Sequence, residues 1–474
     1  MNQQPFPFDY YRTVFDDFAR INKLDTLNDI CDAISIHLPP CIESYDLLSF
    51  GYFKAKEYHK SLEWGNKALQ ASHNTQIACA VRSNLNKSLM CVNQPEQAAN
   101  YIEENLKHNP NNIDALIDLS VALYAANKKT QAGEILRDLQ KSIPQSETQL
   151  HKTLNFNLGI YEIARGNFRQ GLRQISSGRD IKVWGNYTHN FPVPEWQGQP
   201  ARGKKLLVVG EGGAGDEIIN ARFTHHLVQR GMEVHWASAH GLANLFSCLP
   251  VKTTQNYKNF TSEISNIRDF DYWCPAMSLA VYLDADVGDL WQGPYLSVTE
   301  AQKQQGADIL ARHSQIANIN AKIPRVGIRW SGNPHYDHDL HRTVDFNLLW
   351  DSLKNLACDY YSLQRDTNLQ DLDYAQGAVS DLSKDLTSWE TTAAIISQLD
   401  VVVTSCTSIA HLAAAMDKPT IVMVPVLAYY IWPENLNSTY WYSDCVHVIH
   451  QNSPRQWQDV AAQAATILAD LVKD

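Results

Sequence analysis

A glycine-rich loop that ends in an aspartate holds the residue types best suited to chemistry. The apolar run Leu206–Val209 leads into Gly210-Glu-Gly-Gly-Ala-Gly-Asp216, and a helical pattern begins at Glu217. Glycines let the backbone turn sharply, and a helix N-terminus favours negative charge. A carboxylate in such a cleft can take a proton from an attacking hydroxyl group. We therefore predict Asp216 as a general base, with the N-cap residue of the following helix as its alternative role. The loop residues that surround it are Glu211, Gly212, Gly213 and Gly215.

The same loop formally matches the Gly-x-Gly-x-x-Gly pattern of dinucleotide-binding proteins, which would suggest an NAD-dependent oxidoreductase. That function also needs an acidic ribose ligand about 20 residues further on. The next apolar run ends in Trp236-Ala-Ser-Ala-His240, which contains no carboxylate. The sequence therefore disfavours nicotinamide chemistry.

A second group of polar residues could hold an anion. Ser405, Thr407 and Ser408 follow the apolar run Val401–Thr404 at the start of a helical pattern, where amide and hydroxyl groups can stabilise a diphosphate. Arg329 and Arg342 are candidate cationic partners. His411 would lie about one turn into the helix, and either ligand contact or simple packing would suit it.

Composition excludes several other classes of protein. The formal net charge of −11 and the absence of a basic run argue against nucleic-acid binding. The nine cysteines form no C-x-x-C pair and no H-E-x-x-H occurs, so we predict neither a disulfide framework nor a metal site. No bound cofactor is expected. The chain shows neither a signal-peptide pattern nor a membrane-spanning apolar run, so a cytoplasmic location is expected.

Helical repeats precede these motifs. Polar turns followed by small residues recur in the segments 55–61, 92–98, 126–132 and 164–171. Ala98 and Ala132 lie 34 residues apart (132 − 98), which is the tetratricopeptide period. Such arrays present an extended surface to partners. We predict repeats from about Tyr45 to Arg179, with residues 5–44 as a helical cap.

The rest of the chain alternates apolar runs with helical stretches, which is typical of α/β domains. Residues 191–200 are rich in proline and predict an extended linker. A new strand at Arg325, after the helical segment Thr299–Arg312, indicates a second α/β domain. The predicted fold class is thus α plus α/β, with a helical repeat array (1–183), a first Rossmann-like domain (184–320) and a second Rossmann-like domain (321–474).

These motifs resemble a known family. The loop Gly-Glu-x-Gly-x-Gly-Asp-Glu-Ile before Ala-Arg-Phe is similar to the first-strand loop of tetratricopeptide-repeat glycosyltransferases, which are related to bacterial family 9 heptosyltransferases and O-GlcNAc-transferase-like enzymes. The segment Pro194–Pro200 resembles the same group, as do Val326–Pro334 with Arg342-Thr343. The block Asp385–Ala413 resembles the donor-binding region of GT-B enzymes, whose two Rossmann-like domains flank a cleft.

The resemblance implies inverting, metal-independent sugar transfer from a nucleotide sugar to a hydroxyl acceptor, with Asp216 as base. It adds Ser331 and Asn333 to the donor-binding residues. The repeats favour a protein acceptor, for example flagellin or another surface protein. The alternatives are lipopolysaccharide or another glycan as acceptor, and a non-catalytic repeat adaptor with a degenerate GT-B region. Two positions depart from the family pattern: Cys406 and Thr391 stand where acidic residues are usual. Both could alter donor binding.

Overall fold

The computed structural model describes residues 7–144, 148–184, 191–255, 267–291, 293–314, 323–334, 336–365, 368–434 and 436–473. They form two compact units. The repeat unit comprises residues 1–142 with the segments 334–341 and 452–455. The α/β unit comprises residues 143–333, 342–451 and 456–474.

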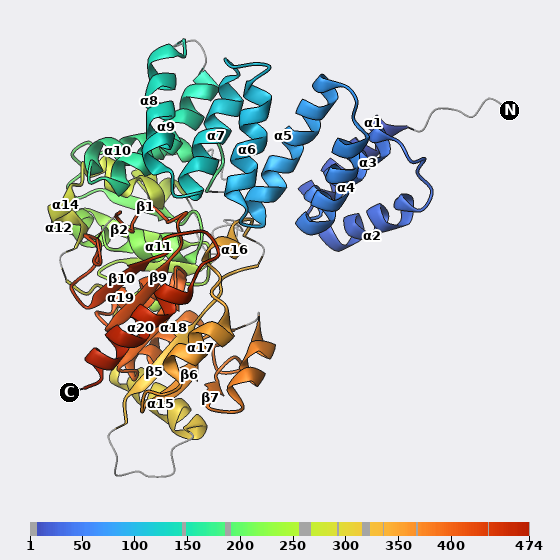
Figure 1. The fold of residues 1–474 in the computed structure, drawn as a ribbon. Coiled ribbons are helices and arrows are strands. Elements are labelled where there is room, and N and C mark those ends of the chain that lie inside the picture. Colours follow the sequence, from blue (N-terminus) through green and yellow to red (C-terminus); the bar gives the residue numbers. More distant parts are fainter. Residues whose placement is uncertain are drawn as a thin grey trace. The chain divides into compact units, whose positions relative to one another are not determined.

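The repeat unit is built from antiparallel helix pairs (Figure 1). Its helices are α1 (Phe8–Arg20), α2 (Leu24–Ser35), α3 (Ile42–Lys54), α4 (Tyr58–Ala71), α5 (Thr75–Cys91), α6 (Pro95–Leu106), α7 (Ile113–Ala125) and α8 (Lys129–Ser142). Each predicted repeat turn in this unit joins two of them. Lys56, Asn93 and Asn127 occupy the turns with φ of 62°, 56° and 62°, the left-handed backbone that often ends a helix. Three of the predicted repeat turns thus join helix pairs of this unit, and the fourth, 164–171, lies in the α/β unit. Helices α1 and α2 lie within the predicted cap segment.

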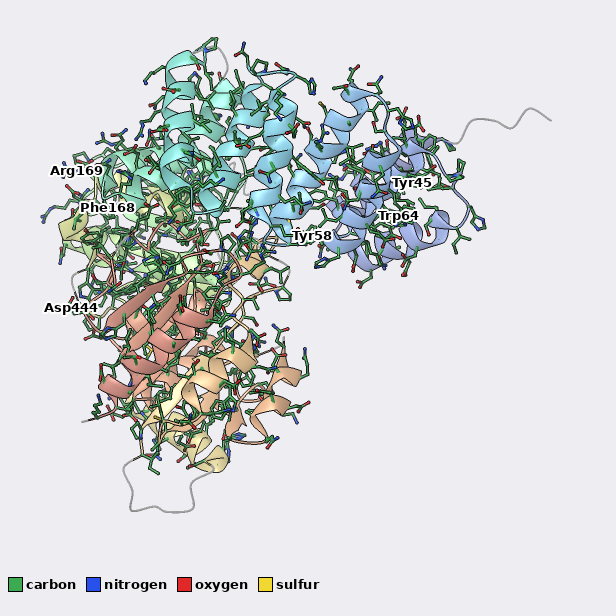
Figure 2. The ribbon with its side chains drawn as sticks, viewed as in Figure 1. Tyr45, Tyr58, Trp64, Phe168, Arg169 and Asp444 are labelled. Carbon is green, nitrogen blue, oxygen red and sulfur yellow. The ribbon has the colours of Figure 1, made fainter. Side chains whose placement is uncertain are left out.

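Small and aromatic side chains fill the seams between these helices. Ala98 and Ala132, the pair 34 residues apart, are both fully buried. Small residues at such positions let paired helices approach closely, as the sequence pattern predicts. Tyr45 of α3 packs on Trp64 of α4 with ring centroids 5.8 Å apart, and Figure 2 shows both at the cap end of the array.

The segments 334–341 and 452–455 are bonded to the repeat helices. Asp337 accepts hydrogen bonds from Lys56 Nζ and Tyr58 Oη, each at 2.7 Å; Figure 2 labels Tyr58. The buried ring of His341 has a pKa lowered to about 4 by burial, so it is neutral near pH 7 and Nε2 donates to the carbonyl oxygen of Met90 at 2.6 Å. These bonds make residues 334–341 part of the repeat unit.

The α/β unit begins with α9 (Thr148–Ala164), α10 (Phe168–Ile175) and η1 (Ser176–Gly178) and continues into a parallel sheet of order β3-β2-β1-β4. The strands of this first sheet are β1 (Lys205–Val209), β2 (Glu233–Ser238), β3 (Lys252–Gln255) and β4 (Tyr272–Pro275). Its helices are α11 (Ala214–Ala221), α12 (Thr224–Gln229), η2 (Leu245–Cys248), η4 (Ile267–Asp269), η5 (Ala276–Ser278), α13 (Leu279–Tyr282) and α14 (Val287–Leu290). The next helix, α15 (Glu300–His313), packs instead on α18 (Trp389–Ser397) of the second sheet, where a Cβ added to Gly306 would lie 2.1 Å from the carbonyl oxygen of Ala394.

A second parallel sheet has the order β10-β9-β8-β5-β6-β7. Its strands are β5 (Arg325–Arg329), β6 (Asp359–Ser362), β7 (Val379–Asp381), β8 (Val401–Ser405), β9 (Thr420–Val424) and β10 (Val446–His450). The helices are α16 (Asp339–Arg342), α17 (Phe346–Leu353), η6 (Leu369–Ala375), α18 (Trp389–Ser397), α19 (Ser408–Ala415) and α20 (Gln458–Leu471). The predicted fold class, helical repeats followed by two Rossmann-like sheets, is confirmed.

The proline-rich segment 191–200 is extended, as predicted, but it is bonded to the first sheet. The backbone N–H of Trp196 donates to the carbonyl oxygen of Trp273 at 2.8 Å, and that of Trp273 donates to Pro194 at 3.1 Å. Trp196 itself is buried. The segment therefore fixes the edge of the sheet beside β4. Within the described part of the chain, no helix combines the length and apolar character that membrane crossing requires.

Candidate functional site

The loop after β1 places Asp216 in the first turn of α11. This helix begins at Ala214, three residues before the start that the sequence predicts at Glu217, with Gly213 as its N-cap. The N–H of Gly213 donates to Asp216 Oδ2 at 2.6 Å. Asp216 is thus the carboxylate at the third helical position that bonds back to the cap, the second half of a capping box. The alternative role of Asp216 as the N-cap residue itself is wrong.

The other carboxylate oxygen of Asp216 faces the second sheet. Oδ1 accepts a hydrogen bond from the hydroxyl group of Tyr429, in the segment after β9. Asp216 is half-buried, and loss of hydration raises its pKa above the ordinary value although both hydrogen bonds act in the opposite direction. A carboxylate with a raised pKa is a better proton acceptor, which suits a general base.

The backbone conformation and the surroundings of Gly212 leave no room for a side chain. Its φ of 72° is left-handed, and an added Cβ would come within 2.4 Å of Asp216 Oδ2. Gly213 has φ of −103°, and a Cβ there would lie 3.5 Å from the same oxygen, an ordinary contact. Only Gly212 is therefore restricted by the carboxylate.

We expect Gly212→Ala to lower the free energy of unfolding by about 1–2 kcal/mol, the cost of a left-handed L-residue, and to displace the Asp216 side chain. Gly213→Ser is the matched control, because serine is a preferred N-cap, and its effect should stay within about 0.5 kcal/mol. Denaturant unfolding of both variants measures the difference. Equal stability of the two variants would contradict the assigned geometry.

Glu211 holds the glycine loop in place through a buried ion pair. Only 1 % of its side chain is exposed, and it forms a bidentate ion pair with Arg179, with Nε–Oε1 and Nη2–Oε2 distances of 3.0 Å. Arg179 Nη2 also donates to Ser278 Oγ at 2.8 Å. Glu211 is therefore committed to holding the loop against the segment after α10. No local feature of the sequence links Arg179 to a residue 32 positions away, so this pair is not predictable from the sequence pattern.

Glu217, which the sequence pattern marks only as the start of a helix, is a second fully buried carboxylate. Its oxygens accept hydrogen bonds from Trp236 Nε1 at 3.1 Å, from the N–H of Ala239 at 2.9 Å and from His240 Nδ1 at 2.9 Å. These bonds join α11 to the end of β2. The helix that carries its neighbour Asp216 is thereby held against the first sheet.

The predicted donor residues lie around β5 and the turn from β8 to α19. Arg329 Nη1 donates to Leu363 O at 2.7 Å, and Ser331 Oγ accepts from Gln364 Nε2 at 2.7 Å. Arg342 Nη1 donates to Cys406 O at 3.2 Å. Arg342 is thus at the turn, and Arg329 is paired with Thr404 in the neighbouring strand. Ser331 is fully buried in the segment after β5, whereas Asn333 is exposed.

The start of α19 offers groups that can bind an anion. Ser405 is fully buried, and its Oγ has no hydrogen-bond partner within the described ranges of the chain. Thr407 is the N-cap, yet its side chain makes no capping bond, and Ser408 begins the helix half-exposed. Unpaired N–H groups, the helix dipole and nearby Arg342 all favour a negative charge here.

His411 packs within the core of the α/β unit. Its ring stacks on Trp432 with centroids 5.4 Å apart, and Nδ1 lies 3.2 Å from the hydroxyl group of Tyr442. Burial, aided by the charges of Arg222 and Arg342, lowers the pKa of His411 to about 3. The ring is therefore neutral at physiological pH, and its contacts correspond to the packing alternative.

The two departures from the family pattern are both built into local structure. Cys406 is buried, with its Sγ 2.9 Å from the indole nitrogen of Trp432, and burial raises the pKa of the thiol. Thr391 lies in the first turn of α18 and its Oγ1 is 3.0 Å from Ser388 Oγ at the N-cap. Neither position therefore carries a negative charge.

The loop at α11 and the start of α19 meet. A Cβ added to Gly215 would lie 3.6 Å from Ser408 Cα and 3.0 Å from His411 Cδ2. This contact brings the predicted acceptor side and the predicted donor side together around Asp216.

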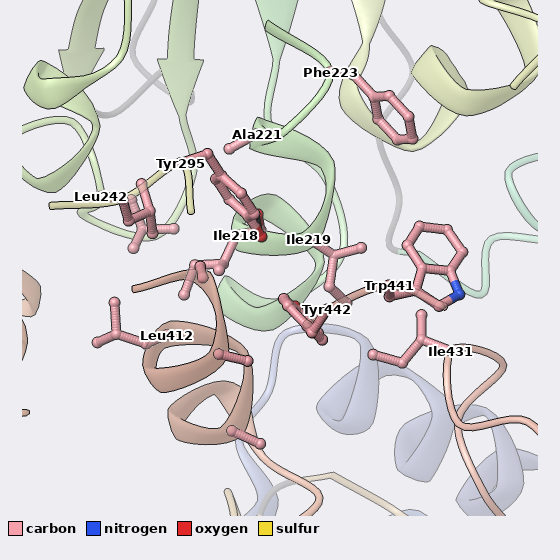
Figure 3. Packing of buried hydrophobic residues seen from close by; sticks show 14 of the residues in the cluster. Ile218, Ile219, Ala221, Phe223, Leu242, Tyr295, Leu412, Ile431, Trp441 and Tyr442 are labelled. Carbon is pink, nitrogen blue, oxygen red and sulfur yellow. Dashed lines mark hydrogen bonds between the residues drawn. The ribbon is translucent and has the colours of Figure 1, made fainter. Parts of the chain in front are cut away.

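Arg222 and a shared apolar cluster hold the two sheets in this arrangement. The buried guanidinium donates to the carbonyl oxygens of Leu290 and Trp441 and lies over the ring of Tyr442, 4.7 Å from its centroid. Figure 3 shows Ile218 and Ile219 of α11 in one cluster with Leu412, Ile431, Trp441 and Tyr442 from the second sheet's side.

Comparisons with known proteins add the following findings. Residues 92–154 match the family model of the tetratricopeptide repeat. No curated protein matched the chain. Among solved structures, ADP-heptose lipopolysaccharide heptosyltransferase II of E. coli is similar, with 13% identity, 56% of this chain and 98% of that chain covered, and a TM-score of 0.41. A mutant of Thermobaculum terrenum O-GlcNAc transferase is similar over 99% of this chain and 91% of that chain, with 11% identity and a TM-score of 0.38. A family 9 glycosyl transferase of Veillonella parvula shares 12% identity over 54% of this chain and 88% of that chain, with a TM-score of 0.38.

Proposed function

We propose that the chain is a glycosyltransferase that moves a sugar from a nucleotide-sugar donor to a hydroxyl acceptor, with inversion at the anomeric carbon. The observation that supports this most is the meeting of Gly215 with Ser408, which sets a half-buried carboxylate beside an anion-binding helix start. One group could accept a proton while the other holds the departing diphosphate.

In the proposed reaction, one bond forms and one bond breaks at the anomeric carbon of the donor sugar. The acceptor oxygen attacks the anomeric carbon, and Asp216 takes the hydroxyl proton. The bond from the anomeric carbon to the diphosphate oxygen breaks, and the diphosphate leaves with the electron pair. The N–H groups at the start of α19, the hydroxyl groups of Ser405 and Ser408 and the guanidinium of Arg342 would stabilise the new negative charge. We propose that these groups do so without a bound metal ion.

The tetratricopeptide match at residues 92–154 supports a protein acceptor, because helical repeats present an extended surface that a polypeptide can follow. A glycan acceptor and a non-catalytic adaptor remain outcomes of the test. The test incubates the full chain with a panel of nucleotide sugars and candidate acceptors and measures nucleotide release and product mass. A protein that shows no release and no donor-induced thermal shift with any donor is not a glycosyltransferase.

Arg342 gives a separate prediction about donor binding. Loss of one hydrogen bond to a charged group costs about 1.5–3 kcal/mol, so Arg342→Gln should weaken the affinity for the nucleotide diphosphate about 10- to 100-fold. Arg342→Lys retains the charge and should lose less. Isothermal titration with the free nucleotide diphosphate measures both variants. Unchanged affinity in Arg342→Gln would remove this residue from the donor site.

A further inference from the structure

Both oxygens of the Asp216 carboxylate already have donors. Oδ2 takes the N–H of Gly213, which belongs to the same loop and keeps the carboxylate in place. Oδ1 takes the hydroxyl group of Tyr429, which comes from the other side of the cleft. An acceptor hydroxyl that loses its proton to Asp216 must donate to this same carboxylate. The phenol therefore makes the bond that a substrate would need to make.

We propose that Tyr429 holds the place of the acceptor hydroxyl on Asp216 and keeps water away from this base until an acceptor displaces the phenol. The inference rests on the proposed glycosyltransferase function and adds a residue that decides between sugar transfer and loss of the donor to water.

The surroundings of Tyr429 allow it to be displaced. Its side chain is half-buried, whereas its neighbours Tyr430 and Trp432 are fully buried, and Trp432 is bonded to Cys406. The rings of Tyr429 and Tyr430 pack against each other with centroids 4.4 Å apart. The buried residues after Tyr429 thus hold the segment in place, while the phenol of Tyr429 extends to Asp216. Burial and the nearby carboxylate raise the pKa of Tyr429 well above its ordinary value, so the phenol keeps its proton.

Water bound to Asp216 in place of the phenol would allow hydrolysis of the nucleotide-sugar donor. A water molecule bonded to Asp216 could give it a proton while its oxygen attacks the anomeric carbon. The sugar–diphosphate bond would then break, which releases free sugar and the nucleotide diphosphate. Tyr429 cannot react in this way while its ring is held in the segment after β9. The phenol therefore donates a hydrogen bond to Asp216 without reacting with the donor.

The hydrogen bond also sets the basicity of Asp216. Besides Tyr429, the titratable groups that act on this carboxylate from the packed elements are Glu217, His240, Tyr430 and Cys406. Burial raises the pKa of Asp216, and the phenol lowers it. Removal of the phenol should therefore raise the pKa of Asp216 further, and the acidic limb of the kcat/KM profile for transfer should move to higher pH.

The test compares Tyr429→Phe with the wild type in the presence and absence of acceptor. We expect the ratio of donor hydrolysis to sugar transfer to rise about tenfold or more, because water no longer competes with a hydrogen bond to a charged group. Tyr374→Phe is the matched control: Tyr374 also donates to a carboxylate, that of Asp351 at 3.1 Å, but on the exposed surface. Its ratio and pH profile should equal those of the wild type.

The outcomes separate the two proposals. A wild type that transfers sugar, together with a Tyr429→Phe variant whose hydrolysis ratio and pH limb are both unchanged, overturns the role of Tyr429 alone. A wild type that releases no nucleotide with any donor overturns the proposed function and this inference with it. A raised ratio with a shifted pH limb supports both. Thermal unfolding of the variant shows whether the fold is retained, since phenylalanine keeps the ring and removes only the hydroxyl group.

Discussion

Replacement of Asp216 with asparagine is expected to lower kcat for sugar transfer by about 10²- to 10⁴-fold, the contribution of a positioned general base. Asparagine keeps the size of the side chain, and its amide oxygen can still accept the N–H of Gly213. The helix cap and the donor site should therefore survive, and the dissociation constant for the donor should change little. A loss in kcat without a loss in donor binding is the pattern expected when an interaction in the transition state is removed.

Asp289→Asn serves as the control for this experiment. Asp289 occupies the same position in α14 that Asp216 occupies in α11, and its Oδ2 accepts the N–H of the N-cap residue Asp286 at 2.9 Å. The two variants change the same kind of capping contact, but only one of them changes the proposed base. Steady-state rates and donor titrations distinguish them. If Asp216→Asn transfers sugar at the rate of Asp289→Asn, Asp216 does no more than cap its helix.

The largest effect on stability is expected from Arg179→Met. This change leaves Glu211, of which 1% is exposed, without the cation that forms two hydrogen bonds to it. A buried charge that loses its partner costs about 3–5 kcal/mol. The glycine loop that carries Asp216 should loosen as well, because Glu211 is its second residue. Denaturant unfolding measures the first effect, and hydrogen exchange at residues 210–216 measures the second.

Two further variants test the cause. Arg173→Met removes an exposed pair, in which Arg173 Nη2 lies 2.8 Å from Asp284 Oδ1, and should cost no more than about 1 kcal/mol. The double variant Arg179→Met with Glu211→Gln removes both charges and should recover part of the loss. If Arg179→Met is as stable as Arg173→Met, the pair does not hold the loop.

Periodicity explains why the architecture could be predicted from the sequence. The repeat turns and the apolar strands β1, β2, β5, β6, β8 and β9 are local patterns that short windows of residues display. Four other strands lack such a local pattern. β3 is the polar sequence Lys-Thr-Thr-Gln, β7 has three residues and β4 ends in proline. β10 has one histidine between its apolar residues and another at its end. Pairing with neighbouring strands, rather than local preference, forms them.

The candidate site was predictable only where one segment carries it. The loop around Asp216 stands out because glycines, a carboxylate and a helix start adjoin in sequence. The residues that bond to this loop are distant in sequence and do not stand out in the same way. Arg179 lies 32 residues before Glu211, and Tyr429 lies 213 residues after Asp216. Tyr429 belongs to an aromatic run whose other members, Tyr430, Trp432, Trp441 and Tyr442, are buried in the core. Composition alone does not distinguish the one ring that reaches a carboxylate from those that only pack.

The bonds between residues 334–341 and the repeat helices limit how freely this chain can be divided. The segment is flanked by Asn333 and Arg342, which are proposed donor-side residues. Within it, Asp337 is bonded to Lys56 and Tyr58, and His341 is bonded to Met90. A shortened chain that begins at residue 143 would keep every strand of both sheets but leave Asp337 and His341 without these partners. A graft of foreign repeats would therefore have to supply new hydrogen-bond partners for Asp337 and His341.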